Sequence, residues 1–499
     1  MRGETQRNEG GRVNEDSGRL ILHGARATGF GFAVRLAARL LFLFVAGRLY
    51  GAAVFGSYAL ALAAVELAVS VGSLGTKKTL FQLLDRHRGG AARPAAHALL
   101  DSALLVLAAS LALGGVIALF AAMLPPETIA AGTATALLLL APAVAGQALL
   151  DLFLAATRWT HVIRDEIVAR SIVEPWALLA GCVAGWGLGW RVEGLAFGYG
   201  CGTLAALLYA ASAARRRLGG LRLRTYRPIR RELSAALRGA ADNTGTDLLN
   251  ALYLRVDLYL VGVLLGEAAA GIYNMARQIA APLRQIRQSF DGLLIPLVAR
   301  SLAVRGGGAT SAALASATRL VLVLQLPLLL FLFTAGGTLL AWLGPTFTGG
   351  YWALVALAAA ETIQAAFSIG DLVFVYLRPR LGLGLTAISI ALGIAAALLL
   401  IPQFGTAGAG LAVLLAYGVR ALLRGWALRA RFAFAVGRAH HAGPVGAAAL
   451  GAAASLALGW ERGPWWPTLA ALAVYAAALQ MWMHLTGQRL GLTGLASED

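Results

Sequence analysis

The chain has few charged residues and few cysteines for its length. Only 13% of its 499 residues are charged, whereas a soluble protein has about a quarter. Its two cysteines, Cys182 and Cys201, fall in apolar stretches, which excludes a disulfide framework and a CxxC metal site. The histidine pair His440-His441 lies in a basic loop without acidic or thiol neighbours. We therefore predict no metal, no cofactor and no catalytic residues.

Long apolar blocks dominate the rest of the sequence, which is 59% hydrophobic with a mean hydropathy of +0.72. Blocks of about twenty apolar residues cross the hydrocarbon layer as helices, because the backbone must satisfy its own hydrogen bonds there. The alternating segments of a β-barrel are missing. We predict an all-α, polytopic membrane protein of about fourteen transmembrane helices. The predicted spans are 27–49, 53–75, 98–122, 131–156, 168–189, 193–213, 234–262, 267–297, 314–343, 348–376, 381–401, 406–426, 443–460 and 466–486.

The net charge of +18 comes mainly from arginines in short loops between the apolar blocks. This placement favours a membrane protein over a nucleic-acid-binding protein, which would have a soluble basic face. With the N-terminus inside, about twenty-five basic residues fall in inside loops, as the positive-inside rule requires. The outside loops hold only Arg48, Arg191 and Arg462. We therefore expect a multi-pass protein of the bacterial inner membrane with both termini cytoplasmic and no external catalytic domain.

A repeated motif divides the chain. Residues 47–58 (GRLYGAAVFGSY) and 262–273 (GVLLGEAAAGIY) share the pattern GxLxGxxxxGxY at an offset of 215 residues. Each copy joins the first two helices of a six-helix set, which indicates a parallel duplication. Convergent hairpin chemistry, in which glycine supplies a tight turn, is the alternative. The predicted domains are a disordered cytoplasmic tail (1–24), an N-lobe (25–232), a C-lobe (233–427) and a final pair of helices with a cytoplasmic tail (428–499).

Three stretches carry a family resemblance. RLAARLLFLFVAGRLYGAAVFGSYALALAAVELAVSVGSLG is similar to the first helical hairpin of the polysaccharide-transporter branch of the multidrug/oligosaccharidyl-lipid/polysaccharide (MOP) exporter superfamily. YLRVDLYLVGVLLGEAAAGIYNMARQI resembles the start of that family's second lobe, including its Arg-x-Asp at Arg255 and Asp257. LGPTFTGGYWALVALA resembles the hairpin before its C-terminal segment. The motifs are loose, so the resemblance specifies the superfamily better than the substrate.

The resemblance implies two six-helix lobes, two extra helices and a flippase rather than an enzyme. Its expected substrate is an undecaprenyl-diphosphate-linked oligosaccharide, moved from the cytoplasmic to the outer leaflet for cell-surface polysaccharide such as the O-antigen of lipopolysaccharide. The expected partners are this anionic lipid-linked glycan, membrane lipids and a polysaccharide polymerase or assembly protein. We expect a monomer, no nucleic acid, and coupling to an H⁺ or Na⁺ gradient or to the membrane potential.

The predicted span 267–297 has one polar face. Seven of its polar or charged residues fall within an arc of about 140° on a helical wheel. Arg284 is near the centre of the span, too deep to reach the interface easily, and a charge there is a functional candidate. The polar face therefore favours a water-accessible cavity. Its members are Asn274, Arg277, Gln278, Arg284, Gln285, Gln288 and Asp291.

Guanidinium groups pair bidentately with phosphate oxygens, so intramembrane arginines are the predicted contacts for the diphosphate headgroup. These are Arg35, Arg39, Arg277 and Arg284. The predicted sugar contacts are Asn250, Tyr253, Gln278, Gln285 and Gln288. The candidates for ion coupling are Asp257, Asp242, Glu66 and Glu361. Arg255 points away from the polar stripe of its own span, toward the outer headgroups.

Alternatives remain at this stage. The charged residues could be structural ion pairs, such as Arg277–Asp257, Arg39–Glu66 or Arg287–Asp291, although buried pairs carry a desolvation penalty. The protein could be a multidrug cation antiporter of the same fold, which predicts an acidic cavity. A membrane glycan polymerase or ligase would need a large external loop. The small-residue patterns Gly181-Gly185-Gly189 and Gly198-Gly202 indicate close helix packing.

Overall fold

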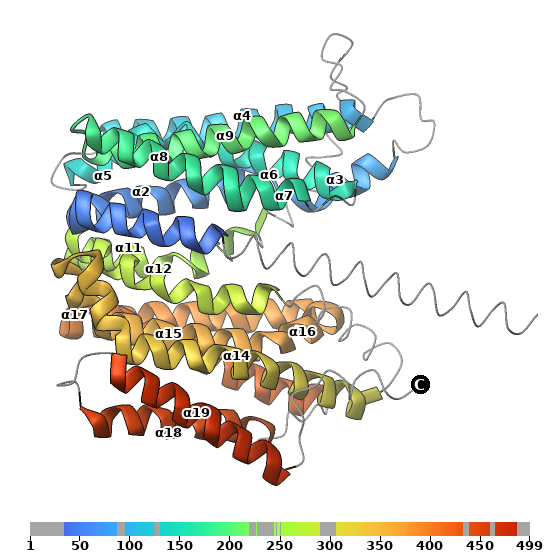
Figure 1. Ribbon diagram of the computed structural model, residues 1–499. Coiled ribbons are helices and arrows are strands. Elements are labelled where there is room, and N and C mark those ends of the chain that lie inside the picture. Colours follow the sequence, from blue (N-terminus) through green and yellow to red (C-terminus); the bar gives the residue numbers. More distant parts are fainter. Residues whose placement is uncertain are drawn as a thin grey trace, which may run out of the picture. The chain divides into compact units, whose positions relative to one another are not determined.

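The computed structural model is helical over nearly all of the chain that it describes, and contains no strand there (Figure 1). Backbone donors and acceptors in an apolar environment are satisfied within each helix, as expected for the apolar blocks. The described residues are 34–86, 95–123, 125, 130–160, 162, 164–218, 226, 244–245, 247–249, 251–289, 306–432, 439–459 and 465–486.

The chain divides into two compact units. Unit 1 holds residues up to Tyr50 and from Ser57 to Leu254, and unit 2 holds Gly51–Gly56 together with residues from Arg255 onward. The domain boundary predicted between residues 232 and 233 lies outside the described residues, and so does the predicted N-terminal tail. The predicted division into domains therefore stays a prediction.

Unit 1 contains a small apolar core, and of its helix α2 the first six residues, Gly51–Gly56, belong to unit 2. Leu150, Leu154, Ala169, Ala206 and Ala210 form that core, and each is at most 2% exposed. The elements are η1 (Ala46–Tyr50), α2 (Gly51–Gly72), α3 (Thr76–Arg86), α4 (Ala95–Met123), α5 (Ala131–Leu140), α6 (Ala143–Trp159), α7 (Arg164–Val168), η2 (Ala169–Val173), α8 (Glu174–Gly187) and α9 (Val192–Arg217). Both η1 and η2 are π-helical turns within longer helices.

Unit 2 contains the remaining elements and two apolar cores. The elements are α11 (Val256–Leu265), α12 (Glu267–Ser289), α14 (Gly306–Leu343), η4 (Pro345–Gly350), α15 (Tyr351–Phe367), η5 (Ser368–Gly370), α16 (Asp371–Leu377), α17 (Pro379–Phe432), α18 (Ala439–Leu458) and α19 (Trp465–Thr486). The final pair, α18 and α19, packs on α14 through Leu326, Leu330 and Tyr475. The Thr468 hydroxyl also hydrogen-bonds the Thr334 hydroxyl at 2.8 Å.

The described residues contain nine helices that are long and apolar enough to cross a membrane, or up to eleven if each bent pair is one span. Two of the nine, Val34–Gly72 and Arg380–Ala430, are 39 and 51 residues long, about twice the length that one crossing needs. Each has a glycine with positive φ near its middle, Gly51 at 77° and Gly405 at 58°. The protein is thus multi-pass, and the number fourteen stays a prediction.

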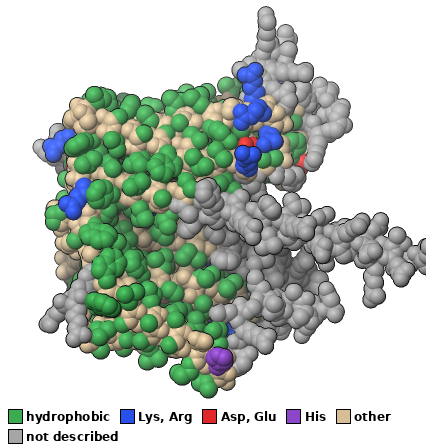
Figure 2. All heavy atoms as spheres, in the orientation of Figure 1, with side chains coloured by type: hydrophobic (Ala, Val, Ile, Leu, Met, Phe, Trp, Pro, Cys, Tyr) green, Lys and Arg blue, Asp and Glu red, His purple; other side chains and the backbone are tan. Residues whose placement is uncertain are grey.

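Large apolar side chains cover the outer faces of the helices (Figure 2). On α4, Leu111, Val116, Leu119 and Phe120 are 55–61% exposed. An apolar surface of this extent is unfavourable in water and favourable in a bilayer. These faces are therefore the ones that contact lipid.

The two copies of the GxLxGxxxxGxY motif have matching local structure. The equivalent glycines Gly51 and Gly266 both have positive φ, 77° and 86°. The equivalent tyrosines Tyr58 and Tyr273 are 3% and 0% exposed. The Tyr58 ring packs edge-on against Phe42 with centroids 6.4 Å apart, and the Tyr273 hydroxyl donates to Asp257 at 2.7 Å. Phe42 and Asp257 are also 215 residues apart in sequence, so the repeat keeps its register.

The small-residue patterns pack helices, as predicted. A Cβ added at Gly181 would lie 2.7 Å from the Cα of Gly198, and one at Gly185 would lie 2.6 Å from the Cα of Gly194. Helices α8 and α9 therefore approach so closely that no side chain fits between them. Gly189 differs from this interpretation, because its φ of +78° and the open space around it mark a turn beyond α8.

Candidate functional site

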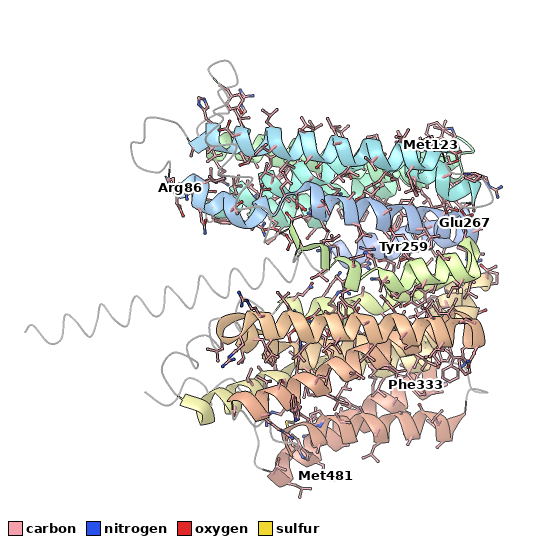
Figure 3. All side chains as sticks on the ribbon, turned by 180° about the vertical axis from the view of Figure 1, so that it is seen from behind. Arg86, Met123, Tyr259, Glu267, Phe333 and Met481 are labelled. Atoms are coloured by element: carbon pink, nitrogen blue, oxygen red, sulfur yellow. The ribbon has the colours of Figure 1, made fainter. Side chains whose placement is uncertain are left out.

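Helix α12 has the polar face that the sequence predicts, and unit 2 supplies acidic partners for it. Figure 3 shows Glu267 at the start of α12 and Tyr259 on the preceding helix α11. Arg277 and Arg284 are two turns apart along α12, a rise of about 10 Å. Each meets a carboxylate from a different helix of the same unit, as the next two contacts show.

Arg277 forms an ion pair with Asp257 of α11, with 3.6 Å between Nη1 and Oδ1. The Tyr273 hydroxyl donates to the other carboxylate oxygen at 2.7 Å. The arginine side chain is only 14% exposed and the aspartate 11%. The distance exceeds that of a hydrogen bond, so Tyr273 holds the carboxylate more tightly than Arg277 does. The alternative of an Arg277–Asp257 pair is therefore confirmed.

Arg284 donates from Nη1 to Oε1 of Glu361 on α15 at 2.8 Å. The Glu361 side chain is 9% exposed and the Arg284 side chain 28% exposed. A guanidinium has five N–H donors, more than one carboxylate takes up. The Arg284 guanidinium therefore has one hydrogen-bonded carboxylate partner and further N–H donors for other acceptors.

Arg255 precedes α11 and lies within electrostatic range of Arg277, Asp257 and Arg284. The predicted direction of Arg255, away from the polar stripe of its own span and toward the outer headgroups, stays a prediction. Arg277 is in turn within electrostatic range of Glu361. Three arginines and two acids of unit 2 thus act on one another. Helix α12 is not among the described helices that are long and apolar enough to cross a membrane, so the predicted span 267–297 stays a prediction.

A second ionic cluster of unit 2 joins Asp371 to α17. Arg420 lies 3.4 Å from Oδ2 of Asp371, and Arg424 contacts Oδ1. Arg424 also donates to the Thr386 hydroxyl at 3.0 Å. Both arginines are 7% exposed. Both arginines fall within the predicted span 406–426, and α17 places them in the packed part of the unit.

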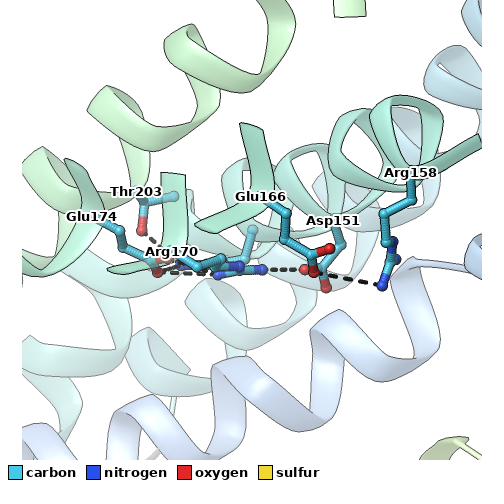
Figure 4. A network of polar contacts seen from close by, with 7 residues as sticks. Asp151, Arg158, Glu166, Arg170, Glu174 and Thr203 are labelled. Carbon is cyan, nitrogen blue, oxygen red and sulfur yellow. Dashed lines mark hydrogen bonds and ion pairs between the residues drawn. The ribbon is translucent and has the colours of Figure 1, made fainter. Parts of the chain in front are cut away.

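Unit 1 has a polar network centred on Arg170 (Figure 4). Its guanidinium contacts Asp151 of α6 and donates to Oε2 of Glu174 at 2.9 Å. Gln147 of α6 accepts from Arg170 at 3.1 Å and donates to Glu174 at 2.9 Å. The amide also donates to the Thr203 hydroxyl of α9 at 3.1 Å. Arg170 thus links Glu174, one turn further along its own helix, to a carboxylate and an amide of α6.

The backbone around Arg170 is a π-helical turn, Ala169–Val173. Such turns inside α-helices are frequent at functional sites, because they re-aim one side chain. Arg35, a predicted headgroup contact, lies within electrostatic range of both Glu174 and Arg170. Two acids and two arginines of unit 1 therefore form a group without a net charge.

The other predicted site residues are spread over both units. Arg39, Glu66, Tyr253, Gln278 and Gln285 are half-buried, and Gln288 is exposed. Asn250, Asp242 and Asp291 lie outside the described residues. Within the described ranges, no group of three or more His, Cys, Asp or Glu side chains could hold a metal ion. The assignment of these residues to headgroup, sugar or ion stays a prediction.

Sequence reasoning missed the Arg170 network, although a signal for it exists. Gln147 and Asp151 are four residues apart in one apolar block, and Arg170 and Glu174 are four apart in the next. Residues at this spacing share a helix face. Two such pairs on consecutive predicted spans would have indicated a polar contact between them.

The arrangement of helices is similar to that of known transporters. The chain matches "Lipid II flippase MurJ, inward closed conformation" with a TM-score of 0.72 at 11% identity, covering 93% of this chain and 99% of that one. It also matches an inward-facing multidrug resistance MATE family transporter of the MOP superfamily, with a TM-score of 0.65, 15% identity, and coverage of 80% and 94%. The chain is therefore a multi-pass membrane protein with the fold of the MOP superfamily.

A third match, with a TM-score of 0.52 and 14% identity, is a MOP superfamily transporter from Pyrococcus furiosus that is described as having a binding pocket of reversed polarity. It covers 82% of this chain and 94% of that one. No curated protein matches the chain by sequence. The family model described as "Polysaccharide biosynthesis protein" matches residues 28–302. The chain belongs to this family.

Proposed function

We propose that the protein flips an undecaprenyl-diphosphate-linked oligosaccharide from the cytoplasmic to the outer leaflet of the bacterial inner membrane. The observation that carries the proposal is the pair of arginines on α12, each of which forms an ion pair with a carboxylate of a neighbouring helix in unit 2. In a polysaccharide biosynthesis protein with a transporter fold, such cations are suited to an anionic carrier lipid.

The chemistry is an exchange of partners. A diphosphate offers several anionic oxygens in the geometry that a guanidinium fork recognises. It can therefore replace Glu361 at Arg284, or Asp257 at Arg277, without leaving either cation unpaired in a region of low dielectric. The prenyl chain stays in lipid, because its burial in the protein would remove no apolar surface from water.

The two arginine positions are about 10 Å apart along one face of α12. A headgroup that leaves one position finds the next cation two turns further along the helix. During alternating access the diphosphate then moves from one arginine to the next. It avoids crossing the bilayer as an unpaired charge, which would have a high free-energy cost. Coupling of this cycle to H⁺, Na⁺ or membrane potential through Asp257, Asp242, Glu66 or Glu361 remains part of the proposal.

Arg284→Ala tests the proposal. In proteoliposomes with a labelled undecaprenyl-diphosphate oligosaccharide, we expect at least a tenfold loss of flipping, since a charge-assisted contact is worth more than about 1.4 kcal/mol. Flipping is measured as the fraction of glycan that a membrane-impermeant glycosidase can reach. Arg380→Ala is the matched control, because Arg380 is an exposed arginine at the start of α17.

Normal flipping by a folded Arg284→Ala variant would refute the role of the α12 arginines. Efflux of a cationic dye without any flipping of the glycan lipid would instead identify a multidrug antiporter. Gel filtration and thermal unfolding of each variant in detergent separate a lost activity from a lost fold.

A further inference from the structure

Unit 2 contains a cavity of about 590 Å³ that lies away from α11 and α12. Helices α14, α15, α17 and α18 supply its walls, which Figure 1 shows together in the second half of the chain. Its volume is in the range of sites that hold a small ligand or a lipid headgroup. The predicted headgroup and sugar contacts are not among its lining residues.

Cationic side chains line part of this cavity. Arg424, Arg429 and His441 all border it. Asp371 and Thr386 hold the Arg424 guanidinium in place, and the His441 ring stacks edge-on against Phe367 with centroids 5.9 Å apart. Positioned groups of this kind lose less conformational entropy when they bind a ligand.

The remaining walls are apolar and open toward the lipid-facing surface. Leu422 is 74% exposed, Trp426 64% and Val445 49%, and all three line the cavity. Tryptophan favours the level of the lipid headgroups, because most of its ring is apolar and its N–H group can donate a hydrogen bond. Arg429 lies near the end of α17 that the charge distribution predicts to be cytoplasmic.

We infer that this cavity binds the phosphodiester headgroup of an anionic phospholipid from the cytoplasmic leaflet. Arg429 donates hydrogen bonds to the phosphate oxygens, Arg424 supplies a fixed positive charge behind it, and one acyl chain lies along Leu422, Trp426 and Val445. Basic pockets between transmembrane helices on the cytoplasmic side recognise anionic lipids by this combination. The inference does not depend on which glycan the protein transports.

A phospholipid explains both the basic part and the apolar part of the cavity wall. Its phosphate needs cations at headgroup depth, and its chains need an apolar wall that is continuous with the bilayer. A glycan-bearing diphosphate would also need polar groups for the sugars, whereas the walls apart from Thr318 and the cationic groups are apolar or glycine. The charge and the apolar rim therefore favour the phospholipid.

Two substitutions with matched controls test the inference on the delipidated full-length protein by native mass spectrometry. Arg429→Gln removes a cation from the wall, and Arg380→Gln removes an exposed cation that does not line the cavity. Gly425→Leu fills the cavity without a change of charge, whereas Gly418→Leu adds the same bulk outside it; a Cβ meets nothing within 4 Å at either glycine.

The wild-type protein is expected to bind phosphatidylglycerol at least tenfold more tightly than phosphatidylcholine. Arg429→Gln and Gly425→Leu should each weaken this binding about tenfold, and the two controls should leave it unchanged. Equal binding of both lipids, or equal binding by all variants, would refute the site. Binding of undecaprenyl diphosphate but not phosphatidylglycerol, with the same sensitivity to both substitutions, would refute the assignment to a phospholipid. Thermal unfolding confirms that each variant is folded.

Discussion

At the scale of single residues, the intramembrane charges of this protein are organised as small ionic groups. Arg284 meets Glu361, and Arg424 meets Asp371, within unit 2. Arg170 meets two acids in unit 1. Such groups are costly to break because removal of one member leaves a buried charge without compensation. Their members should therefore differ sharply from exposed ion pairs in their effect on stability.

Arg170→Gln should destabilise the protein by about 3 kcal/mol, because Asp151 and Glu174 would lose the guanidinium that contacts both of them. Their side chains are only 18% and 17% exposed. Arg158→Gln is the control, since the Arg158–Glu166 pair is 3.5 Å long with side chains 40% and 31% exposed, and should cost less than about 1 kcal/mol. Denaturation in detergent followed by circular dichroism measures both.

Substitutions of the two acids test whether the loss of stability in Arg170→Gln comes from their charges. Asp151→Asn and Glu174→Gln, added to Arg170→Gln, should recover part of the lost stability by removing the two negative charges that Arg170 no longer contacts. Identical unfolding midpoints for Arg170→Gln and the wild type would show that the network does not stabilise unit 1.

At the scale of elements, glycine decides how closely helices pack and where they turn. Gly185 and Gly187 are two residues apart on α8, but only Gly185 faces α9. An added methyl group at Gly185 would clash with the backbone of Gly194, which cannot move aside as a flexible side chain could. The structure therefore separates a packing glycine from a neighbouring one in open space.

Gly185→Ala should lower the stability of unit 1 by about 1–3 kcal/mol through overpacking. Gly187→Ala should change it by less than about 1 kcal/mol, since nothing lies within 4 Å of the new Cβ. The unfolding midpoint in detergent is the measurement for both variants. Equal midpoints would mean that α8 and α9 can separate at no cost, contrary to the packing described above.

The lengths of the apolar blocks predict the bounds of some helices but not the partners of their side chains. Apolar block length predicted α4, α8, α9, α18 and α19 to within a few residues, because each is an isolated run between polar or glycine-containing turns. The predicted span 406–426 includes Arg420 and Arg424, but the length of an apolar block does not predict that Asp371 pairs with both of them.

At the scale of the whole molecule, charge asymmetry along the sequence predicts the topology. The predicted inside loops hold nearly all loop arginines, and one missed or extra span would reverse every later loop. Arg164 and Arg191 flank α8, at opposite predicted sides of the membrane, and both are exposed. They provide positions for a direct test.

In a Cys182→Ala, Cys201→Ala background, a membrane-impermeant maleimide should label Arg191→Cys on intact cells. It should label Arg164→Cys only after the membrane is opened, because that position is predicted to be cytoplasmic. Labelled protein is quantified on gels. The reversed pattern would show that an odd number of spans precedes Arg164 or that the N-terminus is outside.

The sequence by itself determined the membrane location, the all-helical class, the repeat and the polar face of α12. These follow from local properties: the length of apolar runs, the distribution of arginines, and the 3.6-residue period of a helix. Only the tertiary structure decided which acid meets which arginine. Arg284 and Glu361 are 77 residues apart, and a helical wheel gives the face of one helix without the identity of the helix that packs on it. Partners depend on the rotation and depth of each helix in its unit, which packing against the other helices sets.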